Sequence, residues 1–83
     1  MTRPTRCRRI CMEPAYDSFF PDGVLTGEEV IMTLDEYETI RLIDLEEYTQ
    51  HECAKQMNIS RTTVAEIYKS ARYKMADSVV NGK

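Results

Sequence analysis

A short polar run, Ser60-Arg61-Thr62-Thr63, holds side chains well suited to molecular recognition, and Glu66 follows it closely. Arginine presents a rigid fork of donors, an ionised glutamate only accepts, and a threonine hydroxyl does both. Such groups can read the base edges in a DNA groove, where each base pair shows its own pattern of donors and acceptors. We therefore select Arg61, Thr62, Thr63 and Glu66 as candidate base-facing residues.

A second set of side chains surrounds this run and is suited to phosphates rather than bases. Lysine and arginine neutralise backbone phosphates, and serine or threonine hydroxyls donate hydrogen bonds to them. The candidates near the run are Thr49, Ser60, Lys69, Ser70, Arg72 and Lys74, and those in the N-terminal arm are Arg6, Arg8 and Arg9.

The formal net charge of −3 is unfavourable for binding a polyanion, but the charges are segregated along the chain. Residues 1–11 carry four arginines and no acid, residues 12–52 carry twelve acids against Arg41 alone, and residues 53–83 carry six cations against two acids. Because phosphate contact depends on the local field, two basic segments that flank an acidic middle stay compatible with DNA. The acidic middle can also offer a surface to a protein partner.

The cysteines suggest a different chemistry, that of a metal site. Cys7 and Cys11 have the spacing C-x3-C, within the range of zinc ligands, but a complete structural site needs four ligands. His51 and Cys53 are two residues apart and would not share a helix face. We interpret Cys7 and Cys11 as small buried hydrophobes and predict neither a metal nor another cofactor.

Composition and motifs also argue against an enzyme and against a membrane protein. The chain has one histidine, no nucleophile beside a base and no glycine-rich phosphate loop. Its apolar runs are too short for a transmembrane span, and its basic N-terminus lacks the apolar segment of a secretory signal. Three cysteines, an odd number, favour the reducing cytoplasm over a disulfide framework.

Residues 49–68 must position the polar run, and their pattern predicts two helices joined by a tight turn. Thr49 and Glu52 can form a capping box that begins the first helix. Asn58 tolerates the left-handed backbone that ends a helix sharply, and Ser60 is a good cap for the second helix. Apolar residues recur at helical spacing on both sides of the turn, at Cys53, Ala54 and Met57 and then at Val64, Ile67 and Tyr68.

This pattern is typical of a helix-turn-helix, in which the start of the second helix meets base edges in the major groove. A small residue, Ala54, lets the helices approach closely, and Ile59 can fill the corner of the turn. A plain helical hairpin would explain the apolar residues equally well. It explains less well a polar Ser-Arg-Thr-Thr opening at the place where groove contact would occur.

The second helix is predicted to continue well beyond Tyr68. Ala71, Met75 and Val79 extend the apolar spacing, and no residue breaks the helix before Asn81-Gly82. An extension of this kind either contacts phosphates or contributes to a dimer, and the sequence does not choose between the two.

Residues 33–46 are predicted to form an earlier helix that braces the other two. Thr33 and Glu36 can form a second capping box at its start. Arg41 is expected to form a structural ion pair, with Asp44 or a more distant acid. The core-facing stripe is predicted at Leu34, Tyr37, Ile40 and Arg41.

Residues 1–32 are expected to form a basic arm, an aromatic loop and short strands. Prolines and glycines mark residues 13–27 as a loop. Its aromatic rings are expected to cover one edge of the core, with stacking on DNA or a dimer contact as the alternative. Residues 28–32 are predicted to be a strand paired with residues 8–12. The aromatic rings of the loop are Tyr16, Phe19 and Phe20.

With these residues identified, the chain resembles an uncharacterised prokaryotic family of predicted DNA-binding proteins, whose helix-turn-helix is similar to region four of the RNA polymerase sigma factors. The resemblance covers nearly the whole chain and implies a sigma-like DNA-binding domain with a regulatory role. Members commonly carry glycine where this chain has Asn58. The matching residues are Arg3-Pro4, Cys7-Arg8-Arg9-Ile10-Cys11, Leu34, Glu36, Glu38, Ile40-Arg41-Leu42, Asp44-Leu45-Glu46, Met57-Asn58-Ile59-Ser60-Arg61, Ser70-Ala71-Arg72 and Lys74-Met75-Ala76-Asp77.

These observations predict a mainly α fold in one folding unit, with a helix-turn-helix domain over residues 33–83. An N-terminal β-hairpin or extended arm is expected within residues 1–32. The predicted function is sequence-specific binding of double-stranded DNA in transcription regulation. A homodimer is favoured because the motif commonly reads paired half-sites and because so short a chain has a small core. The alternative is a protein-interaction module that docks on the transcription machinery through the acidic middle.

Overall fold

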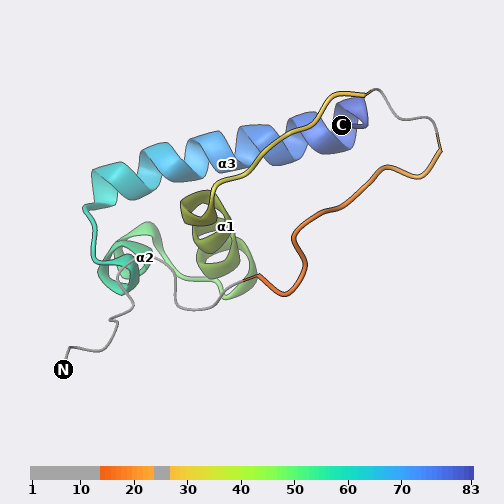
Figure 1. Cartoon of the computed structure of the whole chain (residues 1–83). Helices are drawn as coiled ribbons and strands as arrows, with labels where there is room; N and C mark the ends of the chain where they lie inside the picture. Colours follow the sequence, from red (N-terminus) through yellow and green to blue (C-terminus); the bar gives the residue numbers. More distant parts are fainter. Residues whose placement is uncertain (1–13, 24–26) are drawn as a thin grey trace.

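The fold is mainly helical in the computed structural model, which describes residues 14–23 and 27–83 (Figure 1). Its elements are α1 (Leu34–Ile40), the π-helical turn η1 (Arg41–Leu45), α2 (Gln50–Met57) and α3 (Arg61–Asn81). Figure 1 shows α3 as a long rod, with α1 and α2 on one side of its first half. The predicted predominance of helix is therefore confirmed.

Both predicted capping boxes are present and determine where α1 and α2 begin. At α1, the Thr33 hydroxyl accepts from the Glu36 N–H at 3.1 Å, and the Glu36 carboxylate accepts from the Thr33 N–H at 2.8 Å. At α2, Thr49 and Glu52 make the same two bonds at 3.0 and 2.8 Å. Each box satisfies two backbone donors that the helix itself leaves without a partner.

The predicted long helix is confirmed, and α3 runs without interruption to Asn81. It ends at Gly82, whose φ of 68° is the left-handed conformation that glycine adopts without strain. The inner face of α3 is buried at Val64 and Ala71, whereas Val79 is 78% exposed. The apolar spacing thus continues beyond the part of α3 that α1 and α2 cover.

A small core closes between η1, α2 and α3. Its members have at most 6% of their surface exposed, and Ile43, Tyr48 and Ile59 pack against them. This confirms the predicted apolar face of α2 and the position of Ile59 at the corner of the turn. The core residues are Leu42, Cys53, Ala54, Met57 and Val64.

The core-facing stripe predicted for the first helix is correct only in part, because Tyr37 and Ile40 are half-buried and Leu34 is exposed. Leu34 is 51% exposed, and the buried residues of α1 are Glu36, Glu38 and Thr39. Polar groups can be buried here because each has a partner. The Thr39 hydroxyl donates to the Asp35 carbonyl at 2.6 Å, and the two carboxylates are neutralised by cations.

Arg41 forms a structural ion pair, as the sequence predicts, but it pairs with Glu38 and Glu46 and not with Asp44. The guanidinium donates to both carboxylate oxygens of Glu38, at 3.0 and 2.9 Å, and lies 3.6 Å from Glu46. Asp44 instead accepts from the Tyr68 hydroxyl of α3 at 2.7 Å.

The strand predicted at residues 28–32 is also wrong, because the described residues contain no strand. This segment is extended and follows the second half of α3 (Figure 1), where Lys74 Nζ donates to the Ile31 carbonyl at 2.7 Å. Side chains of α3 thus hold the segment where the prediction placed a partner strand. The expected partner, residues 8–12, lies outside the described residues.

The aromatic side chains of the N-terminal loop do not cover the core, contrary to prediction. Tyr16, Phe19 and Phe20 are 77%, 82% and 77% exposed. They are not needed there, because η1, α2 and α3 already close the core from within residues 42–64.

Candidate nucleic-acid interface

The turn between α2 and α3 sets how the start of α3 is presented. Asn58 has φ 60° and ψ 45°, the left-handed conformation predicted for it. Its N–H donates to the Lys55 carbonyl at 3.2 Å, and the Ile59 N–H donates to the Ala54 carbonyl at 3.0 Å. These two bonds satisfy carbonyls at the end of α2 and, with Ile59 packed on the core, turn the chain sharply from α2 into α3.

Ser60 begins α3 as its N-cap, as predicted. Its hydroxyl oxygen accepts from the Thr63 N–H at 3.1 Å and lies 2.8 Å from the Thr63 hydroxyl, with which it is hydrogen-bonded. Thr63 is half-buried and turned toward this cap. Of the candidate base-facing residues, Thr63 is therefore placed for a structural role at the start of the helix.

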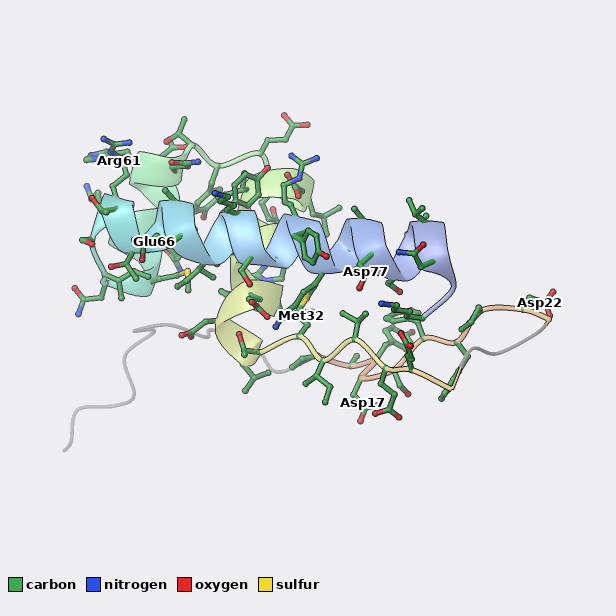
Figure 2. The ribbon with its side chains drawn as sticks, turned by 90° about the horizontal axis from the view of Figure 1, so that it is seen from above. Asp17, Asp22, Met32, Arg61, Glu66 and Asp77 are labelled. Atoms are coloured by element: carbon green, nitrogen blue, oxygen red, sulfur yellow. The ribbon has the colours of Figure 1, made fainter. Side chains whose placement is uncertain are left out.

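The other three base-facing candidates, Arg61, Thr62 and Glu66, are exposed on the first half of α3. Figure 2 shows Arg61 at the start of this helix and Glu66 further along it, whereas Asp77 lies in the second half. Thr62, Glu66 and Lys69 follow one another at spacings of four and three residues, so they share one face of the helix. All three are exposed, on the side of α3 away from buried Val64.

The phosphate candidates divide into groups with different surroundings. Within the described residues, Lys69 is exposed and forms no ion pair. The Thr49 and Ser60 hydroxyls are exposed but already act as helix caps. Arg72 lies over the Tyr68 ring at 5.4 Å and donates to its hydroxyl at 2.9 Å. The remaining arginines of this set, Arg6, Arg8 and Arg9, lie outside the described residues.

Ser70, which is exposed, and Lys74, which is half-buried, both donate hydrogen bonds to Glu36 of α1. Lys74 Nζ lies 2.8 Å from Glu36 Oε1, and the Ser70 hydroxyl donates to Glu36 Oε2 at 2.5 Å. Burial raises the pKa of Glu36, but the hydrogen bonds from Lys74, Ser70 and the Thr33 backbone outweigh it and lower the pKa to about 2. Ser70 and Lys74 thus hold an ionised carboxylate between two helices.

Lys55 also lies at the turn that presents Arg61, although the sequence pattern does not identify it as a phosphate candidate. It is exposed near the end of α2 and, with Arg61, lines a shallow hollow at the turn. The other lining residues are His51, Ala54, Asn58 and Ile59. On the α2 helical wheel Lys55 lies on the side opposite buried Cys53 and Met57, and this position could have marked it as solvent-facing.

Cys7 and Cys11, whose spacing fits metal ligands but which we interpret as buried hydrophobes, lie outside the described residues. Cys53 is buried in the core, where burial and, secondarily, the charge of Glu38 raise the pKa of its thiol to about 11. Within residues 14–23 and 27–83, no group of three metal-ligating side chains comes together. Nor does any helix in that part have the length and apolar character needed to cross a membrane.

The fold and this surface define a small, mainly α-helical domain in which a capped turn presents the polar start of a long helix. The chain belongs to the family described as "Protein of unknown function DUF134", whose model matches residues 1–83. No solved structure matches it.

Similar proteins span the whole of this chain. A UPF0251 protein of Desulfitobacterium hafniense (strain DSM 10664 / DCB-2) is 55% identical over 85 residues, which cover 100% of this chain and 68% of that protein. A UPF0251 protein of Thermoanaerobacter pseudethanolicus is 49% identical, with 100% of this chain and 72% of that protein covered. One of Caldicellulosiruptor bescii is 46% identical, with 100% and 59% covered.

Proposed function

We propose that this protein binds double-stranded DNA through a helix-turn-helix made of α2, the turn at Asn58 and α3. In this proposal the start of α3 enters the major groove, and the domain regulates transcription in the manner implied by its resemblance to sigma-factor region four. Arg61, Thr62 and Glu66 face bases, and Lys69 and Lys55 face phosphates. The N-terminal arginines Arg6, Arg8 and Arg9 are proposed as further phosphate contacts.

The observation that carries this proposal is the exposure of the first half of α3. A helix that only completed a helical hairpin would have no need to leave Arg61 and Lys69 exposed without an acidic partner among the described residues. Cations left without an intramolecular partner are available for phosphates, whose neutralisation supplies much of the affinity of a DNA-binding protein. The first backbone N–H groups of a helix have no acceptor within the helix, and at the start of α3 phosphate oxygens can accept from those that Ser60 does not cap.

The proposal uses fewer residues of α3 than the sequence suggests. Ser70 and Lys74 are occupied by Glu36, and Arg72 is held by Tyr68. We therefore assign Ser70 and Lys74 to the packing of α3 on α1, and leave Arg72 as a secondary phosphate contact at the edge of the surface.

The alternative function is a protein-interaction module. Glu46, Glu47 and Glu52 are exposed around the link between η1 and α2 and line a second shallow hollow with Lys55. A basic surface on a partner, for instance on the transcription machinery, would find these carboxylates accessible. In this case the acidic side rather than the start of α3 carries the interaction.

Titration of the purified protein with a labelled random-sequence duplex at increasing salt separates the two functions. A DNA-binding protein loses affinity as a power of salt concentration, because each neutralised phosphate releases counterions. Arg61→Ala should weaken binding, whereas Lys83→Gln removes a positive charge that already pairs with Glu28 and Asp77 beyond the far end of α3, and serves as the control. A protein-interaction module would show no saturable complex with duplex even at low salt.

Selection of bound sequences from random duplexes then addresses the oligomeric state. A homodimer with two-fold symmetry selects inverted half-sites about one helical turn apart, roughly 34–36 Å between centres. A monomer selects one asymmetric site.

A further inference from the structure

A carboxylate such as that of Glu66 is not expected on a surface whose only role is to attract phosphates. Glu66 is the single acid on the first half of α3, one helical turn after Thr62 and three residues before Lys69, and all three are exposed on one face. A carboxylate accepts hydrogen bonds but donates none. Facing a phosphate it would repel the DNA backbone, at a cost to the affinity that Arg61 and Lys69 provide.

Glu66 has no role within the fold that would account for its presence. In the part of the chain that the structure describes it forms no ion pair with Lys69 or any other cation, and it is exposed to solvent. It also lies beyond the first turn of α3, whereas the favourable effect of the helix dipole on an acid is confined to that turn. A group that contributes little to its own helix is free to act on a partner.

The chemistry of the major groove limits which base a carboxylate can accept from. Two exocyclic amino groups are exposed there, N4 of cytosine and N6 of adenine. Adenine also presents its N7 acceptor beside N6, so a second carboxylate oxygen would face a lone pair. Cytosine presents its amino group without a neighbouring major-groove acceptor, and it is the base with which glutamate and aspartate pair.

We propose that Glu66 is a specificity-determining residue that accepts a hydrogen bond from N4 of a cytosine, so that the target site carries a fixed G·C base pair at that position. The inference rests on the proposed DNA-binding function and deepens it by naming what one side chain reads. The negative charge of Glu66 lowers the affinity of the protein for every duplex, whereas its hydrogen bond to cytosine favours the duplexes that carry one particular base pair.

The test is a comparison of sequences selected from random duplexes by the wild-type protein and by Glu66→Gln. Glutamine keeps the length of the side chain but adds an amide donor, and it pairs with N6 and N7 of adenine. We expect the cytosine at one position to be replaced by adenine, with about a tenfold or greater change in the relative affinity of the two duplexes. The unfolding midpoint should not change, because Glu66 is exposed and unpaired within the described residues.

Glu29→Gln is the matched control, since it removes the same charge from an exposed residue on the extended segment before α1. It should leave base preference unchanged, with at most a uniform rise in affinity. The inference alone is overturned if Glu66→Gln selects the same bases as wild type. Binding of duplexes by the wild-type protein without base preference would overturn the inference together with the assignment of Arg61 and Thr62 to bases. The absence of any saturable duplex complex would overturn the proposed function together with this inference.

Discussion

Lys74 in the middle of α3 donates a hydrogen bond to Glu36 at the start of α1, with 2.8 Å between Nζ and Oε1. The same ammonium group donates to the Ile31 carbonyl at 2.7 Å, and Ser70 donates to the second oxygen of Glu36. One carboxylate thereby joins the extended segment, α1 and α3. The direction in which the exposed start of α3 points is therefore set partly by contacts two to four turns further along the same helix.

Removal of the Lys74 charge should lower the free energy of unfolding, whereas the affinity of the folded protein for DNA should change little. Lys74→Met keeps most of the aliphatic stem but leaves the largely buried Glu36 carboxylate without its cation. Loss of such a charged hydrogen bond typically lowers the free energy of unfolding by about 1–3 kcal/mol. Urea unfolding measures this loss directly.

Lys69→Met provides the comparison for Lys74→Met. Lys69 is exposed and without an ion-pair partner in the described residues, so its free energy of unfolding should change by no more than about 0.5 kcal/mol. In duplex titrations the order should reverse, with Lys69→Met the weaker binder under conditions where both variants are folded. A Lys74→Met protein that is fully stable yet defective in DNA binding would contradict this assignment.

The hydrogen bonds that Lys74 and Ser70 donate to Glu36 should make the free energy of unfolding fall at acid pH. Because its pKa is about 2 in the folded protein and near 4.5 in an unfolded chain, its contribution to stability is complete above about pH 4.5 and is lost as the pH falls toward 2. Glu36→Gln should therefore be less stable than wild type at pH 7, by on the order of 2 kcal/mol. The difference in the free energy of unfolding between wild type and Glu36→Gln should narrow as the pH is lowered. Urea unfolding at a series of pH values would show this. A constant difference from pH 7 to pH 3 would rule out this role for the carboxylate.

Two positions in the left-handed conformation should gain stability from glycine. Asn58 has φ 60° and Glu47 has φ 65°. Asparagine tolerates this conformation better than glutamate does, so Glu47→Gly should stabilise the fold more than Asn58→Gly, with both gains near 1 kcal/mol or less. Asn58→Ala should destabilise it by about 1 kcal/mol. Thermal unfolding followed by circular dichroism would establish the order, and a gain from Asn58→Ala would contradict the role of the turn.

The helix ends were predictable because their signals are local. A Thr with Glu three residues later, an Asn at the end of an apolar pattern and a Ser before Arg61 each act through hydrogen bonds within one turn. The same is true of Gly82 at the end of α3. These residues therefore fixed the limits of α2 and α3 without knowledge of the tertiary structure.

The burial of α1 was not predictable from periodicity, because its buried face is polar. Glu36 and Glu38 are read as solvent-facing residues until their cations are known, and one of these, Lys74, is 38 residues away. The same long-range contact explains why Lys74 and Ser70 were predicted to contact phosphates. Sequence position places them on α3, but only the packing of α1 shows that both are bonded to Glu36.

Arg61 and Lys69 should contribute to DNA binding in different ways. Arg61 is exposed at the start of α3, and in the proposed mode of binding its guanidinium donates two bonds to a guanine, so Arg61→Ala should cost about 1–3 kcal/mol on a selected site and less on random duplex. Lys69→Ala should instead weaken all duplexes alike and lower the slope of log affinity against log salt by about 1. Titration of each variant against a selected and a random duplex at several salt concentrations distinguishes the two effects. If both variants bind as wild type does while Lys83→Gln does not, the contact surface lies at the other end of α3.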